Sequence, residues 1–291
     1  MSTIKDALEY AVGKLALEGQ KSALLDAQVL LGHVLDVDRA MLYTYPERAL
    51  TSGQEQQFFQ LIERRERGEP VAYLTGHKEF YGLDFFVDKR VLIPRPETEL
   101  LVEIALSVMR KRLNAGQIPI LADIGTGSGA IPIALVVEEP RLPYLYASDI
   151  SSEALDVARR NVQRHHVEQR VHLLHGDLLS PLPEPVDILI ANLPYVGTDE
   201  MNILAPDILA YEPQLALFSG PNGLDLVCRL LIEAKQSAML KSEAILLLEI
   251  GYQQRKALAE VINELWPGAI VTFKRDYAGW DRVLQVALPA A

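Results

Sequence analysis

The sequence has little of what several classes of protein depend on. It has one cysteine, Cys228, among 291 residues, so no internal disulfide can form, and its apolar neighbours favour a buried thiol over a nucleophile. Lys and Arg number 28 against 39 Asp and Glu, which gives a formal net charge of −11. Proteins that hold nucleic acid non-specifically need a positive field instead. We therefore expect no stable nucleic-acid partner.

Long apolar runs are also missing. No segment reaches the roughly 18 apolar residues of a membrane-spanning helix, and the start, "MSTIKDALEYAVGKLALEG", carries acidic groups where a signal peptide has an apolar stretch. His165, His166, His172 and His175 have no cysteine or carboxylate at a convincing ligand spacing, so we predict no metal site. The expectation is a cytoplasmic protein without membrane contact.

The hydrophobic pattern changes twice along the chain. Residues 1–75 hold apolar residues at helical spacing, as in "SALLDAQVLLGHVL", and predict a small helical bundle. There, Ser52 and Glu55 have the spacing of a capping box. Aromatic and β-branched residues predict a β-hairpin linker over residues 76–96. From residue 97 to 291 strands alternate with helices, which predicts an α/β domain with a mostly parallel sheet covered on both faces.

A glycine-rich turn follows the first strand of the α/β domain. The segment "LADIGTGSGAIPIALV" spaces its glycines as G-x-G-x-G. Glycine lets the backbone approach a ligand closely, and the first amides of the next helix favour negative groups. The spacing differs from the dinucleotide fingerprint G-x-G-x-x-G, and the P-loop lysine is absent. The candidate ligand residues of this turn are Asp123, Gly125, Thr126, Gly127, Ser128 and Gly129.

Later strand ends carry further candidate ligand residues. The second strand ends at Asp149, where an acid commonly accepts hydrogen bonds from ribose hydroxyls; the alternative is an acid that serves the N-terminus of the next helix. The third ends at Asp177 and Leu178, an acceptor beside an apolar wall that suits adenine. The fourth, "VDILIA", ends before Asn192. Because parallel strands end at one edge of the sheet, we expect these residues to share one crevice.

The four residues after the fourth strand, Asn192-Leu193-Pro194-Tyr195, allow two interpretations. Asn and Pro are common in turns, and a turn alone would account for them. Polar groups just past a strand that is buried on both faces are also usual at ligand sites. The tetrapeptide by itself leaves both interpretations open.

The order of the motifs, D-x-G-x-G-x-G, then Asp, then Gly-Asp, then N-x-P-Y, resembles that of class I S-adenosylmethionine-dependent methyltransferases that act on planar nitrogen. Residues 68–103, "GEPVAYLTGHKEFYGLDFFVDKRVLIPRPETELLVE", are similar to the signature of the HemK/PrmC family of protein-(glutamine-N5) methyltransferases. Segments 211–225, 248–254 and 276–284 are similar to later parts of that family. The resemblance implies a Rossmann-like methyltransferase domain, whose mostly parallel sheet ends in one antiparallel strand near 282–288, and an N-terminal helical bundle that recognises the substrate.

The resemblance also implies an activity and a role for each motif. Such an enzyme transfers a methyl group from S-adenosylmethionine to the side-chain nitrogen of the glutamine in the Gly-Gly-Gln motif of peptide-chain release factors. Gly125 to Gly129 then hold the methionine part of the cofactor, Asp149 the ribose, and Asp177 with Leu178 the adenine, while Asp123 and Asn192 also belong to the cofactor site. The catalytic tetrapeptide that holds the substrate amide is Asn192, Leu193, Pro194 and Tyr195.

Leu193 departs from the family's usual Asn-Pro-Pro-Tyr. Asn-Leu-Pro-Tyr also looks like the motif of ribosomal RNA adenine dimethylases, so the alternative function is adenine-N6 methylation of rRNA or DNA. Segments 68–103 and 211–225 have no counterpart in the dimethylases, and the net charge of −11 also argues against a nucleic-acid substrate. The sequence therefore predicts the protein-modifying enzyme.

Overall fold

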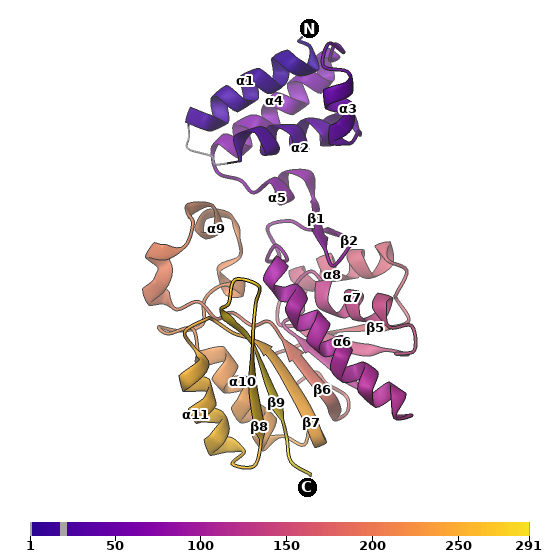
Figure 1. The fold of residues 1–291 in the computed structure, drawn as a ribbon, viewed down its shortest axis with the longest axis vertical. Helices are drawn as coiled ribbons and strands as arrows, with labels where there is room; N and C mark the ends of the chain where they lie inside the picture. The colour runs from indigo at the N-terminus through magenta and orange to yellow at the C-terminus, as the bar shows by residue number, and fades with distance from the viewer. Residues whose placement is uncertain (1, 18–21, 291) are drawn as a thin grey trace. The chain divides into compact units, whose positions relative to one another are not determined.

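The computed structural model describes residues 2–17 and 22–290. The chain forms two compact units, Met1–His77 with Ala205–Tyr211 and Lys78–Leu204 with Glu212–Ala291, which we call the helical unit and the sheet unit (Figure 1). Within the described ranges, no helix is both long and apolar enough to cross a bilayer. The domain boundaries expected at residues 75/76 and 96/97 stay predictions.

The helical unit is held together by the apolar sides of its helices. Helices α1 and α2 pack on α4, and buried residues such as Ala11, Leu30 and Phe58 form one core. The helices of this unit are α1 Ile4–Leu17, α2 Ala23–Leu35, α3 Arg39–Thr44, α4 Ser52–Glu66, α5 Val71–Thr75 and α9 Pro206–Tyr211.

The start of α4 corrects one prediction. The capping box expected at Ser52 and Glu55 is wrong by one residue: the Thr51 hydroxyl accepts from Gln54 N at 3.3 Å, and the Gln54 side chain accepts from Thr51 N at 3.0 Å. The extended backbone of Thr51, with φ −68° and ψ 156°, is the conformation that an N-cap requires. Glu55 instead accepts a hydrogen bond from Ser2 Oγ at 2.6 Å.

The predicted hairpin is formed by β1 His77–Phe80 and β2 Leu83–Phe86. Its turn residues, Tyr81 and Gly82, both have positive φ, at 52° and 72°, as a tight two-residue hairpin turn requires. Asn161 of α8 (Ser152–Arg164) then binds the second strand: Phe86 N donates to Asn161 Oδ1 at 2.7 Å, and Asn161 Nδ2 donates to Phe86 O at 2.9 Å. This side-chain amide fastens β2 to the sheet unit.

A seven-stranded sheet, in the order β5-β4-β3-β6-β7-β9-β8, forms the centre of the sheet unit. β3 pairs in parallel with β4 and β6, whereas β9 is antiparallel to both of its neighbours. The predicted fold class, a mostly parallel Rossmann-like sheet with one antiparallel strand, is confirmed. The strands are β3 Leu121–Ile124, β4 Leu145–Asp149, β5 Val171–His175, β6 Val186–Ala191, β7 Leu240–Glu249, β8 Ile270–Arg275 and β9 Asp281–Ala287.

Helices cover both faces of the sheet. Ala122, Leu189 and Leu246 share a core with residues of α10 and α11, which lie together on one side, and α6, α7 and α8 lie on the other (Figure 1). The apolar residues of the central strands point to both faces, so their sequence reads as a continuous apolar run. The remaining elements are η1 Pro96–Thr98, α6 Glu99–Asn114, α7 Ala130–Glu138, η2 Thr198–Ile203, η3 Gln214–Ala216, α10 Asp225–Gln236 and α11 Arg255–Leu265.

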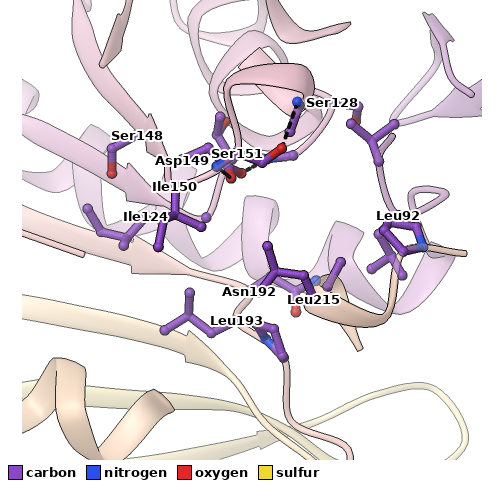
Figure 2. Close-up of a pocket in the computed structure, with 18 of the residues that line it drawn as sticks. Leu92, Ile124, Ser128, Ser148, Asp149, Ile150, Ser151, Asn192, Leu193 and Leu215 are labelled. Carbon is purple, nitrogen blue, oxygen red and sulfur yellow. Dashed lines mark hydrogen bonds between the residues drawn. The ribbon is translucent and has the colours of Figure 1, made fainter. Parts of the chain in front are cut away.

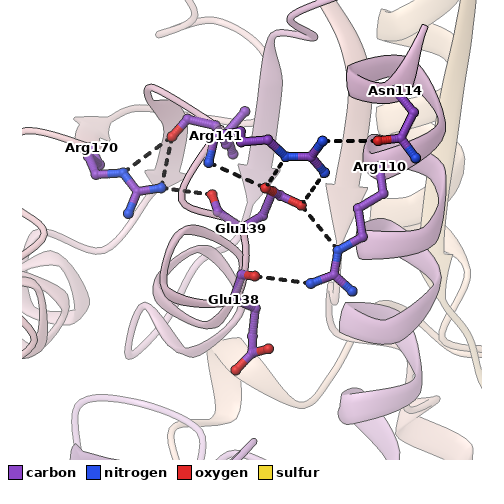
Figure 3. Close-up of polar contacts among 7 residues, drawn as sticks. Arg110, Asn114, Glu138, Glu139, Arg141 and Arg170 are labelled. Carbon is purple, nitrogen blue, oxygen red and sulfur yellow. Dashed lines mark hydrogen bonds and ion pairs between the residues drawn. The ribbon is translucent and has the colours of Figure 1, made fainter.

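One buried carboxylate, Glu139, ties the end of α7 to α6 (Figure 3). Arg141 donates to its two carboxylate oxygens at 2.7 and 2.9 Å, and Arg110 of α6 donates to Oε2 at 3.1 Å. Arg170, next to β5, donates to the main-chain oxygen of Glu139 at 2.9 Å. The guanidinium groups, Arg141 above all, lower the pKa of the Glu139 carboxyl to about 2 against the opposing effect of its burial. The network thus joins α6, the end of α7 and the start of β5 through the side chain and the main-chain oxygen of one residue.

We expect Glu139→Gln to lower the free energy of unfolding by about 1–3 kcal/mol at pH 7, because the two guanidinium groups lose their negative partner. A carboxyl whose folded pKa is depressed stabilises the fold above its ordinary pKa of 4.5 and loses that contribution as the pH falls towards about 2. Urea unfolding at pH 7 and pH 3 should therefore give a difference from wild type that shrinks in acid. The control is Glu138→Gln, whose exposed side chain is replaced while its main-chain oxygen still accepts from Arg110 at 3.0 Å. An equal difference in the free energy of unfolding at pH 7 and at pH 3 would contradict a depressed pKa for Glu139.

Candidate active site

A cavity of about 270 Å³ lies at the carboxyl ends of β3, β4, β5 and β6. Figure 2 shows Asp149 and Ser128 on one side of it and Asn192 and Leu193 on the other. The predicted residues in its lining are Gly125, Thr126, Gly127, Ser128, Asp149, Asp177, Leu178, Asn192, Leu193 and Pro194. Asp123, Gly129 and Tyr195 are predicted site residues that do not line it.

The glycine-rich turn between β3 and α7 forms one wall. Gly125, Gly127 and Gly129 have φ of 76°, 54° and 80°, in the left-handed region that residues with a Cβ avoid. Gly125 N and Thr126 N both donate to Ser148 O at 2.9 Å, which fixes the turn against the end of β4. The turn thus presents its main chain to the cavity, and no atom lies within 4 Å of where a Cβ on Gly127 would stand.

Asp149 joins this turn to the start of α8. Its Oδ2 accepts from Gly127 N at 2.8 Å, and its Oδ1 accepts from Ser151 N at 2.9 Å. Burial raises the pKa of Asp149, although the Ser151 and Gly127 donors oppose the rise. Asp149 therefore does contact the start of the next helix, as the alternative interpretation expected. Each of its carboxylate oxygens still has a lone pair that could accept from a ligand in the cavity.

Asp123 is almost completely buried, with 1% of its surface exposed. Neither of its carboxylate oxygens, nor the hydroxyl of Thr126, has a hydrogen-bond partner among the described residues. Burial is the main reason that the pKa of Asp123 rises to about 7. Such a group is costly to keep charged without a partner.

Asp177 and Leu178 form the wall beyond β5. The Asp177 carboxylate is half exposed and pairs with Arg229 of α10, which also lines the cavity. Leu178 is buried and adopts a positive φ of 44°. Sequence reasoning missed Arg229 because its 52-residue separation from Asp177 follows no local spacing.

The tetrapeptide after β6 is held by side chains from distant segments. Asn192 Nδ2 donates to Thr98 Oγ1 at 3.1 Å, and no described residue hydrogen-bonds Asn192 Oδ1. The hydroxyl of Tyr195 donates to Glu249 Oε1 at 3.2 Å, and Gln254 Nε2 donates to Tyr195 O at 2.9 Å. Burial, with the nearby charge of Glu249, raises the pKa of the Tyr195 hydroxyl. All three partners lie in segments that resemble the family, Thr98 in 68–103 and both Glu249 and Gln254 in 248–254, and this resemblance was the available signal.

Comparison with known proteins assigns the family. A profile described as the PrmC N-terminal domain matches residues 6–76, and one described as the methyltransferase small domain matches residues 98–220. The release factor glutamine methyltransferase of Moorella thermoacetica is 41% identical over 281 residues, covering 96% of both chains. The chain belongs to this family. A second member, from Koribacter versatilis, is 39% identical over 265 residues and covers 90% of this chain and 91% of its own.

Solved structures agree on the fold of this family member. The hMettl16 catalytic domain, crystallised with MAT2A 3'UTR hairpin 1, aligns with a TM-score of 0.55 at 14% identity, covering 85% of this chain and 84% of its own. The human methyltransferase 10 domain containing protein gives a TM-score of 0.51 at 15% identity, covering 72% and 89%. At such identities the likeness concerns the fold alone.

The close contact between the glycine turn and the tetrapeptide leads to a stability prediction. A Cβ on Gly125 would lie 2.9 Å from Leu193 Cδ2, whereas one on Gly127 would meet no atom within 4 Å. We expect each alanine variant to lower the free energy of unfolding by about 1 kcal/mol, because a residue with a Cβ is strained in the left-handed region. Gly125→Ala should lower it by about 1–2 kcal/mol more, because the buried Leu193 side chain must move. Urea unfolding of the two variants measures this difference, and an equal decrease in both would disprove the contact.

Proposed function

We propose that this chain transfers a methyl group from S-adenosylmethionine to the side-chain amide nitrogen of the Gly-Gly-Gln glutamine in peptide-chain release factors. Membership of the release factor glutamine methyltransferase family supports the reaction and the substrate class. The observation that carries it is Asn192 at the cavity: its Nδ2 donates a hydrogen bond to Thr98 Oγ1, while its Oδ1 has no hydrogen-bond partner among the residues that the structure describes. The alternative, an adenine-N6 methyltransferase, has no support from these relatives.

The cavity suits the cofactor by the chemistry of its lining. Asp149 retains lone pairs for two ribose hydroxyls, Leu178 offers an apolar surface for adenine, and the Gly125–Gly129 turn gives close approach without side chains. When bound, S-adenosylmethionine supplies an electrophilic methyl group on a sulfonium.

The task of the protein is to orient a poor nucleophile. The lone pair of an amide nitrogen is delocalised into its carbonyl, so the nitrogen reacts only when held in line with the methyl group. Asn192 Oδ1 and the main-chain carbonyl of Leu193 accept the two amide N–H groups of the substrate. Their dipoles also stabilise the positive charge that develops on the nitrogen. No general base is needed, since the methylated nitrogen is acidic enough to release its proton afterwards.

A release factor as substrate also bears on which part of the chain recognises it and on where the enzyme works. We propose that the helical unit contributes to recognition of the release factor and that the enzyme works in the cytoplasm, where release factors act. Recognition of a folded protein requires more surface than the cavity offers to one glutamine side chain.

Asp149→Ala tests the cofactor site. We expect the dissociation constant for S-adenosylmethionine, measured by titration calorimetry, to rise about 10- to 100-fold through the loss of hydrogen bonds to a charged acceptor. The control is Asp156→Ala on the following helix α8, which removes an exposed ion pair with Arg159. Unfolding curves should accompany the titration, because Asp149 also binds two main-chain N–H groups. An unchanged dissociation constant would remove Asp149 from the site.

Asn192→Ala tests the reaction itself. With release factor as substrate, mass spectrometry should find one added methyl group on the Gly-Gly-Gln peptide after incubation with the wild-type chain. The variant should lower kcat by about 100-fold or more, whereas its affinity for S-adenosylmethionine changes far less. Label from a tritiated methyl donor that enters ribosomal RNA or DNA, and not the release factor, would overturn the proposal in favour of the alternative.

A further inference from the structure

Glu249, the last residue of β7, is a buried carboxylate next to the tetrapeptide, and the reaction described above gives it no role. Only 3% of its surface is exposed. Its Oε1 accepts from the Tyr195 hydroxyl at 3.2 Å, and its Oε2 has no hydrogen-bond partner among the described residues. A charged oxygen without a partner in such a place costs stability, so a fold that keeps it there calls for an explanation.

Thr98 connects Glu249 to Asn192. The Thr98 residue is 5% exposed, and its hydroxyl oxygen already accepts from Asn192 Nδ2 at 3.1 Å, which leaves its single proton to be donated elsewhere. The same hydroxyl lies close enough to Glu249 to lower the pKa of that carboxyl, which burial raises. Glu249 is thus a neighbouring acceptor to which Thr98 can donate, because its Oε2 has no hydrogen-bond partner among the described residues.

The charge state of Glu249 would fix the direction of such a chain of hydrogen bonds. An ionised carboxylate can only accept, so a Thr98 hydroxyl that pairs with it must donate to Glu249 while it accepts from Asn192. The NH₂ group of Asn192 then faces Thr98, and its oxygen faces the cavity. An uncharged amide in place of Glu249 would be able to donate, and the whole chain would then be free to reverse.

We propose that Glu249 is a positioning residue: through Thr98 it holds the Asn192 amide with its oxygen towards the cavity, and through the Tyr195 hydroxyl it holds the other end of the tetrapeptide. This rests on the proposed function, because only a substrate that donates N–H groups needs the oxygen on that side. Arg282 of β9 is the nearby cation that compensates the charge of Glu249, and it is itself paired with Asp276 at 3.3 Å.

Glu249→Gln is the nearly isosteric test. Reversal of the chain would present the Asn192 NH₂ to the substrate NH₂, donor against donor, so kcat for release factor should fall about 10- to 100-fold. The dissociation constant for S-adenosylmethionine should stay within about threefold, since the glycine turn and Asp149 are untouched. The matched control is Glu97→Gln, which removes an exposed charge beside Glu249 and no member of the chain.

A second pair of variants separates positioning from mere packing. Thr98→Val keeps the shape of the side chain and breaks the connection, so kcat should fall, and Thr98→Ser should recover most of the loss because it restores the hydroxyl. In the Thr98→Val background, Glu249→Gln should cost clearly less than it does alone. Fully additive losses, or a kcat for Glu249→Gln within about twofold of wild type, would overturn the proposal.

The side-chain ¹⁵N–¹H spectrum provides a readout that needs no turnover. The Asn192 NH₂ resonances should shift in Glu249→Gln and Thr98→Val and stay in place in Glu97→Gln. If the wild type fails to methylate release factor while these shifts appear, the proposed function fails and the hydrogen-bonded chain stands. If the wild type is active and the resonances do not move in Glu249→Gln, the role of Glu249 is refuted and the proposed function stands.

Discussion

Parallel pairing of β3 with β4 and β6 is the constraint on which the rest of the candidate site depends. Asp123 lies opposite Ala147 and Ile190 in the sheet, and Ile124 opposite Ser148 and Ala191, so all three chain segments leave the sheet at one level. The glycine turn, Asp149 and Asn192 follow from these positions within one to five residues. Since backbone hydrogen bonds set this register, a one-residue slip of a strand would turn its side chains to the opposite face of the sheet and would shift the residues that follow it.

The end of β6 alone cannot hold the tetrapeptide in place, because its four residues lie outside regular secondary structure and their polar groups need hydrogen-bond partners. Gln254 supplies part of the support: its Nε2 donates to Tyr195 O at 2.9 Å and to Gly223 O at 3.1 Å. Gly223 has φ of 71°, and a Cβ there would lie 2.0 Å from Tyr195 O. The loop around 223 and the segment after β7 therefore pack directly on the tetrapeptide, which explains in physical terms why a chain with this site also carries "YEPQLALFSGPNGLD" and "LEIGYQQ".

Much of the fold could be predicted from the sequence because it rests on local pattern. The strand expected at Val186–Ala191 has the same bounds in the structure, since five apolar residues, interrupted by Asp187 alone and flanked by turn residues, leave little choice. The cap of α4 was misplaced by one residue because Thr51 and Ser52 have the same chemistry and differ only in backbone conformation. The partners of the tetrapeptide could not be predicted. Thr98 lies 94 residues from Asn192, and Glu249 lies 54 from Tyr195, and no local spacing encodes such contacts.

Leu193, where the sequence departs from the family's Asn-Pro-Pro-Tyr, can be understood from its surroundings. Its side chain is buried, with 6% of the residue exposed, and its Cδ2 lies 2.9 Å from the position of a Cβ on Gly125. No described residue hydrogen-bonds its main-chain N–H, so the proline of the family would forfeit no such bond at this position. The proline that follows, Pro194, biases residue 193 towards the extended region whatever its side chain is. In the proposed reaction only the main-chain carbonyl of residue 193 is used, so leucine alters the packing between the glycine turn and the tetrapeptide and leaves the acceptor in place.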